Sequence, residues 1–179
     1  PNTSLNNYII DIEGNHNFYL HDLYFDLTSN TNIGTIKCYR DKEYMQYENN
    51  KSFRLENITI KHNLSEMELI KIQNFSSVTI DNVDIKGTYP NNKGIGLSFE
   101  GGINNKINNI YCSYLQKAIL LKTSDINLEG FESNNIVLLT CEEGLSIESY
   151  NTAPQIISIS LNNSIIDQCL YPWKNMGGK

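Results

Sequence analysis

One short pattern centred on Asn or Asp recurs along the 179 residues of this chain and constrains its fold more than any other feature. In each copy, two apolar residues at alternate positions precede the central residue and two more follow it. Alternation of this kind predicts a strand on either side of a bend. The central residues lie roughly 25 to 35 positions apart and are Asp22, Asn57, Asn82, Asn109, Asn135 and Asn163.

A second series of short alternating strands runs between these copies. A single coil of two strands cannot bury its apolar face, but similar coils stacked on one another can. We therefore predict an all-β stack of about six coils over residues 1–169, in which like strands pair in parallel at about 4.8 Å. Residues 170–179 break the pattern and are expected to be a tail or a cut end, and the chain is expected to be a fragment of a longer protein because it starts without Met. The predicted inward pairs are Ile10/Ile12, Ile36/Cys38, Ile70/Ile72, Leu97/Phe99, Ile119/Leu121 and Leu145/Ile147.

The recurring Asn has a physical reason. A bend between two strands of one coil needs a residue near the left-handed backbone region, which Asn and Asp tolerate better than other non-glycine residues. Stacked Asn side chains can also pass hydrogen bonds from coil to coil. A β-sandwich or barrel is the alternative, but it would need hairpin turns of the Asn-Gly or Asp-Gly type, and neither dipeptide occurs.

Composition argues against several other classes of protein. The formal net charge is −6, whereas a general nucleic-acid binder presents a basic face. The sequence contains no run of roughly 18 apolar residues, so we expect no membrane insertion. The four cysteines lack the spacing of a zinc site, and we expect neither a metal nor a cofactor. Cys38 and Cys112 fall at inward positions and are interpreted as buried thiols, with two disulfides as the alternative.

The aliphatic stacks and the file of asparagines at Asn57, Asn82, Asn109, Asn135 and Asn163 resemble the right-handed, single-stranded parallel β-helix of the pectin-lyase-like superfamily. The resemblance covers about residues 8–169, and that fold carries lyases, hydrolases and binding proteins. The Asn- and Ile-rich, Arg-poor composition further resembles the shaft of a bacteriophage tail spike or appendage. This second resemblance implies a homotrimer on the virion tail that binds a bacterial surface polysaccharide. A cellular origin would instead imply a secreted or cell-surface protein.

Outward positions of the short strands predict a column in which carboxylates alternate with Tyr, Gln and Lys. Sugar hydroxyls need planar acceptors and donors, and tyrosine rings offer flat apolar faces; we therefore expect Tyr39, Gln73 and Lys122 to bind substrate. Glu100 and Glu148 are the candidate catalytic carboxylates, with backbones about 9.6 Å apart. That spacing is compatible with the carboxylates of inverting glycoside hydrolysis, about 6.5–9.5 Å apart. The alternative is that these side chains are solubilising charges in attractive pairs.

Apolar outward residues in the later coils predict a subunit interface made of Leu120, Val137, Leu139 and Ile165. The alternative is that a C-terminal segment of the same chain covers them. Loops at residues 41–52 and 88–94 interrupt the repeat, and such loops often carry binding function. The sequence thus leaves three functions open: a tail-spike-like polysaccharide binder with or without hydrolysis, a non-enzymatic structural shaft or adhesin segment, and a cellular pectin-lyase-like enzyme. Calcium-dependent lyase chemistry ranks below hydrolysis, because no Asp-rich loop occurs.

Overall fold

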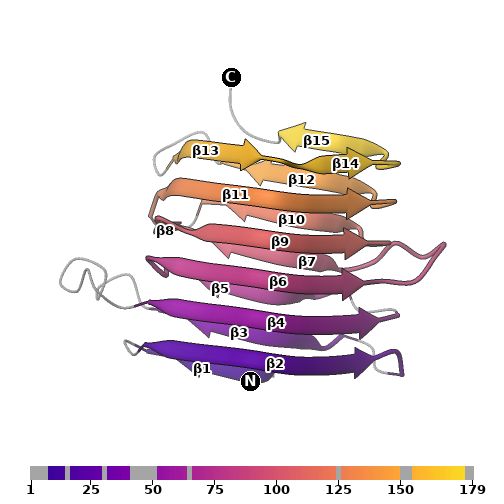
Figure 1. Ribbon diagram of the computed structural model, residues 1–179, viewed down its shortest axis with the longest axis horizontal. Helices are drawn as coiled ribbons and strands as arrows, with labels where there is room; N and C mark the ends of the chain where they lie inside the picture. Colours follow the sequence, from indigo (N-terminus) through magenta and orange to yellow (C-terminus); the bar gives the residue numbers. More distant parts are fainter. Residues whose placement is uncertain are drawn as a thin grey trace, which may run out of the picture.

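The computed structural model describes residues 8–14, 17–29, 32–40, 52–63, 66–123, 126–149 and 155–175. The predicted loop at residues 41–52 lies, apart from Ser52, outside this part of the chain. Strands are the regular elements of these ranges (Figure 1). No helix among the described residues has the length and hydropathy needed to cross a bilayer.

The strands form two parallel sheets that share one stacking direction (Figure 1). The seven-stranded sheet contains, in spatial order, β1 (Tyr8–Glu13), β3 (Gly34–Tyr39), β5 (Glu68–Gln73), β7 (Ile95–Glu100), β10 (Lys117–Lys122), β12 (Glu143–Glu148) and β15 (Tyr171–Asn175). The eight-stranded sheet runs through β2 (Phe18–Leu27), β4 (Phe53–His62), β6 (Val78–Lys86), β9 (Lys106–Ser113), β11 (Leu128–Leu139) and β13 (Ile156–Asn162), and β8 (Gly102–Ile103) and β14 (Ile165–Asp167) also pair with β11.

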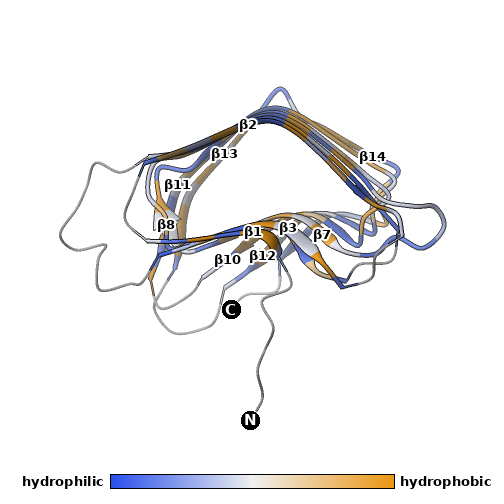
Figure 2. Ribbon diagram, turned by 90° about the horizontal axis from the view of Figure 1, so that it is seen from below, coloured by the Kyte–Doolittle hydropathy of each residue, from blue (hydrophilic) through white to orange (hydrophobic). Residues whose placement is uncertain are grey.

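Because the chain alternates between the two sheets, each strand lies over the like strand of the preceding coil, and the predicted parallel β-solenoid is confirmed. Figure 2 looks along the stack and shows the eight-stranded sheet bent into a roof above the flatter seven-stranded sheet. Strand pairing goes on past residue 169, since β15 pairs with β12 and places Trp173 beside Leu145.

The predicted Asn-marked corner lies within β2, β4, β6, β9 and β11, and between β13 and β14 in the last coil. Its residues all have a left-handed backbone, with φ between 48° and 56° from Asp22 to Asn163. The corner also restores the direction of the side chains: in β2, Leu20 and Leu23 both point toward the core although they are three positions apart. Without the left-handed residue, simple alternation would point the apolar side chains of one strand half toward the solvent.

The corner side chains link one coil to the next. Asn57 Nδ2 donates to Asp22 Oδ1 at 2.8 Å, and Asn82 Nδ2 donates to Asn57 Oδ1 at 2.7 Å. Asn135 Nδ2 donates to Asn109 Oδ1 at 3.1 Å. At two coils the acceptor is the residue before the corner instead, because Asn109 donates to Asp81 and Asn163 donates to Asn134.

The inward side chains form continuous aliphatic and aromatic stacks. Ile36, Ile70 and Leu97 are fully buried and lie in register on neighbouring strands. The rings of Phe99 and Phe131 meet edge to face across the interior, with centroids 5.1 Å apart. The core therefore lies between the two sheets along the whole stack.

The four cysteines are free thiols, which settles the alternative that the sequence left open. Cys38, Cys112 and Cys141 are buried within the stacks and Cys169 is partly exposed. Burial raises the pKa of the Cys38 and Cys112 thiols. These side chains act as small apolar fillers.

His62, at the end of β4, is a polar side chain inside this core. It is 1% exposed, and neither ring nitrogen has a hydrogen-bond partner among the described residues. Burial disfavours the charged imidazolium and lowers the pKa of His62 to about 4. The ring is therefore neutral in the folded protein near neutral pH.

Replacing the corner residue Asn109 by Ala is expected to destabilise the fold by about 2 kcal/mol. The change removes the hydrogen bonds to Asp81 and from Asn135. It also leaves alanine, which lacks the short polar side chain that favours the left-handed region, on a backbone with φ of 54°. Urea unfolding measures the loss, and N109G should lose less than N109A because glycine adopts this backbone freely. N108A is the matched control; an equal loss in N108A and N109A would contradict the role of the corner.

His62 is expected to make the fold sensitive to mild acid. An unfolded histidine binds its proton at a pKa of 6.5 and the folded one only near 4, so the unfolded state binds more protons between these values. Stability should therefore fall by about 3 kcal/mol as the pH drops from 6.5 to 4. H62L should remove this part of the pH dependence in urea unfolding. Parallel pH profiles for the two proteins would contradict the expectation.

Candidate functional site

The outer face of the seven-stranded sheet carries the residues that the sequence singled out for chemistry. Strand register places Tyr39 beside Gln73, Gln73 beside Glu100, and Lys122 between Glu100 and Glu148. The five residues thus occupy one file across β3, β5, β7, β10 and β12, in the predicted order. Their catalytic and binding roles stay predictions.

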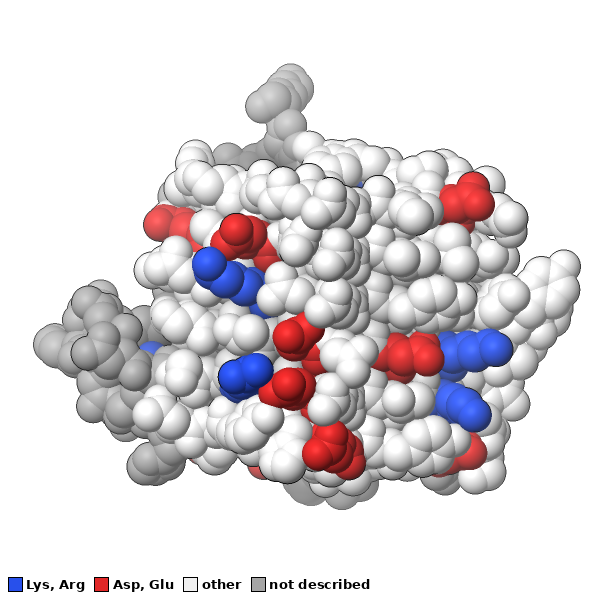
Figure 3. Space-filling model, viewed as in Figure 1, with Lys and Arg blue, Asp and Glu red and all other residues white. Residues whose placement is uncertain are grey.

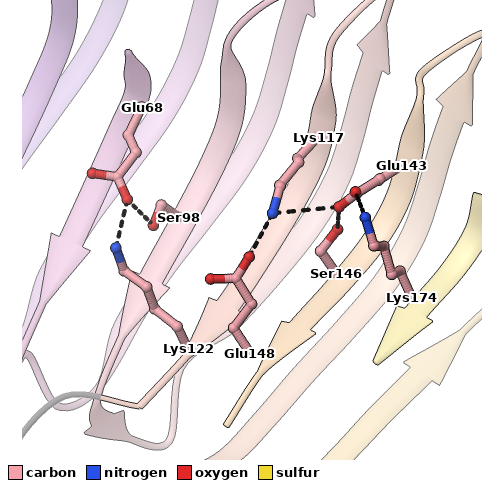
Figure 4. A network of polar contacts seen from close by, with 8 residues as sticks. All are labelled: Glu68, Ser98, Lys117, Lys122, Glu143, Ser146, Glu148 and Lys174. Atoms are coloured by element: carbon pink, nitrogen blue, oxygen red, sulfur yellow. Dashed lines mark hydrogen bonds and ion pairs between the residues drawn. The ribbon is translucent and has the colours of Figure 1, made fainter. Parts of the chain in front are cut away.

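A first cluster of charges lies around Glu68, the first residue of β5. Glu68 contacts Lys122 at 2.9 Å and Lys71 at 3.0 Å, and it accepts a hydrogen bond from the Ser98 hydroxyl at 2.8 Å (Figure 4). Both lysines also contact Glu100, each at 3.3 Å. Two carboxylates and two ammonium groups therefore alternate and neutralise one another.

Two members of this cluster, Glu68 and Lys122, stabilise each other in the charged form. Burial by itself would raise the pKa of Glu68, but the charges of Lys122 and Lys71 and the hydrogen bonds from Lys122 and Ser98 outweigh it and hold the pKa below its usual range. Burial would likewise lower the pKa of Lys122, but Glu68 and Glu100 raise it overall. Glu68 and Lys122 are consequently held as a charged pair.

A second cluster centres on Glu143, the first residue of β12, which is 3% exposed. It contacts Lys117 at 3.4 Å, accepts a hydrogen bond from Ser146 at 2.5 Å and pairs with Lys174 (Figure 4). Lys117 also reaches Glu148 at 2.5 Å. Burial would raise the pKa of Glu143, but the hydrogen bonds from Lys174 and Ser146 and the charge of Lys117 hold it below its usual range.

The two candidate catalytic carboxylates belong to different clusters. Glu100 is paired with Lys71 and Lys122, and Glu148 is paired with Lys117. A general acid for glycosidic cleavage needs a raised pKa. Burial raises a carboxyl pKa at Asp84, but this residue lies on the eight-stranded sheet. Each of the two candidate carboxylates would therefore have to leave a lysine partner before it could act on a substrate.

Sequence reasoning missed Glu68, Lys117 and Glu143 as members of this face. It assumed strict alternation, but the second and third residues of β5, Leu69 and Ile70, are both buried while Glu68 points outward. The signal was present in the sequence, since β5, β10 and β12 each begin with a charged residue followed by two small or apolar ones. A strand of this kind presents its first residue outward.

The predicted interface residues divide between the two sheets. Leu120 lies on β10 and is 3% exposed, so it does not belong to an exposed patch. Val137 and Leu139 are partly buried on β11, and Ile165 pairs with Val137 and is 58% exposed. Figure 3 looks onto this sheet and shows an area without charged side chains over the C-terminal halves of β9 and β11.

Among the described residues, no group of three His, Cys, Asp or Glu side chains is placed to share a metal ion. No family model, curated protein or solved structure matches this chain.

Replacing Glu143 by Gln is expected to destabilise the fold by about 2 kcal/mol, because the change removes a charge that Lys117 and Lys174 share. E142Q, at the neighbouring partly exposed position, is the matched control and should change stability by less than about 0.5 kcal/mol. Because the folded pKa of Glu143 is lowered, its contribution is present above the unfolded pKa and is lost as the pH falls through the folded one. Urea unfolding from pH 7 to pH 3 should show the difference between wild type and E143Q shrinking below about pH 4.5; a constant difference would contradict the assignment.

Proposed function

We propose that this chain is a solenoid module of the tail-spike type that binds a bacterial surface polysaccharide along the outer face of its seven-stranded sheet. One observation carries the proposal: Tyr39, Gln73, Glu100, Lys122 and Glu148 form a single file on five neighbouring strands. The file runs along the stack, so a linear polymer laid on it meets a new side chain at each coil.

The chemistry of the file suits sugars. Gln73 supplies an amide, Lys122 an ammonium donor and Tyr39 a partly exposed ring with the Lys37 ammonium 5.7 Å from its centroid. The carboxylates and lysines are already fixed by their mutual ion pairs, so little side-chain freedom is lost when a ligand binds. A fixed polar surface of this kind favours binding by many weak hydrogen bonds.

Cleavage of the polysaccharide would need more than the file supplies. Glu100 and Glu148 would have to leave their lysine partners and one of them would have to carry a proton. Binding is therefore the main part of the proposal, and hydrolysis by this pair is its weaker extension. Loss of reducing-end release in both E100Q and E148Q would support the extension.

A non-enzymatic structural shaft is the second candidate. The continuous corner hydrogen bonds and the self-neutralised charges favour it, because both stiffen the stack without needing a ligand. In either case the uncharged area with Val137, Leu139 and Ile165 is proposed as the contact between subunits of a homotrimer. Light scattering should then give three times the 20.4 kDa chain mass.

Replacing Tyr39 by Ala is expected to weaken polysaccharide binding about tenfold, since it removes the apolar ring face of the file. Y24A is the matched control, because Tyr24 also has a lysine ammonium near its ring, at 5.6 Å from Lys61, but lies on the other sheet. Capsular and lipopolysaccharide glycan arrays followed by calorimetry on the strongest hit provide the measurement. Equal losses of affinity in Y39A and Y24A would contradict the file as the binding surface. If the folded wild-type protein binds no polysaccharide, the structural shaft is favoured.

A further inference from the structure

The loop at residues 88–94 is fixed against coils that follow it in the stack. It joins β6 to β7, and Figure 1 shows it projecting beside the ends of the long strands. Asn92 Nδ2 donates to the Thr140 carbonyl at 2.9 Å, and Thr140 lies two coils further along, just after β11. Lys93 pairs with Glu66 at 2.7 Å on the other side. These contacts hold the loop in place before any ligand arrives.

An open groove of about 480 Å³ lies between this loop and the last coils. Its volume falls within the range of roughly 300–1,000 Å³ that is usual for small-molecule sites. Pro90, Asn91 and Asn92 form one wall, and Thr140, Glu142 and Leu170 belong to the other. Since both walls are tied together by the Asn92–Thr140 hydrogen bond, the groove is preformed.

The lining combines polar groups with apolar surface. Asn91 offers amide donors and an acceptor, Thr140 a hydroxyl and Glu142 a carboxylate that can accept from two neighbouring hydroxyls. Pro90 and the 68% exposed Leu170 give apolar contact for the carbon face of a ring. This mixture of apolar faces and vicinal acceptors is what a sugar ring needs.

The charged residues that line the groove favour neutral sugars over acidic ones. Lys93 is already neutralised by Glu66, while Glu142 leaves a carboxylate in the lining. An acidic sugar would bring a second negative charge next to Glu142 and would be disfavoured. The groove is therefore matched to an uncharged ring.

We propose that this groove is a second saccharide site, which binds one neutral sugar unit such as a branch or terminal residue of the polysaccharide. The inference rests on the proposed polysaccharide binding for its biological meaning, but the groove is separate from the file on the seven-stranded sheet. It gives the module contact with a side branch while the file contacts the main chain.

Nuclear magnetic resonance titration of the ¹⁵N-labelled chain tests the proposal. The probes are methyl α-D-glucopyranoside, methyl α-D-galactopyranoside and N-acetyl-D-glucosamine, with D-glucuronic acid as the anionic comparison. At least one neutral sugar should give saturable shifts at the amides of Asn91, Asn92 and Glu142, with a Kd on the order of 1 mM. Glucuronic acid should bind at least about fivefold more weakly.

Two substitutions in the groove, each with a matched control, complete the test. E142Q and L170A should each weaken binding of the neutral sugar about fivefold or more. E132Q and I157A, which change a glutamate and an aliphatic residue at exposed positions of β11 and β13, should leave it unchanged. Y39A should also leave the groove shifts unchanged, so failure of the file and failure of the groove are told apart.

Either of two results would overturn the inference. One is the absence of saturable shifts at the groove with every neutral probe up to about 100 mM, a hundred times the expected Kd. The other is equal binding of glucuronic acid and the neutral sugars.

Discussion

Hydrogen bonds between side chains at one corner of successive coils hold the register on which the rest of the solenoid depends. At this corner a left-handed residue joins two strand halves, and it keeps the apolar residues of both halves on the inside. Parallel pairing then copies the arrangement from coil to coil, because each residue lies beside its equivalent. This register produces both the stacks of inward apolar side chains and the files of outward polar side chains.

Much of this arrangement is readable from the sequence, because two periods coincide. The alternation of side chains marks the strands, and the repeated Asn marks where the alternation changes phase. Together they gave the order of the two sheets, the buried positions of Ile36 and Cys38, and the file from Tyr39 to Glu148. Local sequence patterns predict this fold because, in a solenoid, each coil contacts only its neighbours.

The parts that sequence reasoning missed are those where one coil departs from the period. Glu68 and Glu143 point outward, although strict alternation from the inward pairs Ile70/Ile72 and Leu145/Ile147 would turn both of them inward. Leu120 occupies an outward position but is only 3% exposed. The outward direction of a side chain does not by itself predict whether that side chain is exposed. The place of the 88–94 loop depends on contacts between residues far apart in the sequence, such as the hydrogen bond between Asn92 and Thr140, which are 48 positions apart, and the ion pair between Lys93 and Glu66. No local pattern encodes a contact of that kind.

The repetition of inward positions from coil to coil determines how readily the solenoid changes length. The two sheets are built from coils whose inward apolar positions match those of the coils above and below: Ile70 and Ile119 both lie beside Leu97, and Ile72 and Leu121 both lie beside Phe99. A duplicated coil would therefore arrive with compatible neighbours on both sides and lengthen the rod by about 4.8 Å. Gain or loss of whole coils is thus a small step for such a chain, whereas gain or loss of one residue within a strand would turn a whole row of side chains to the opposite face.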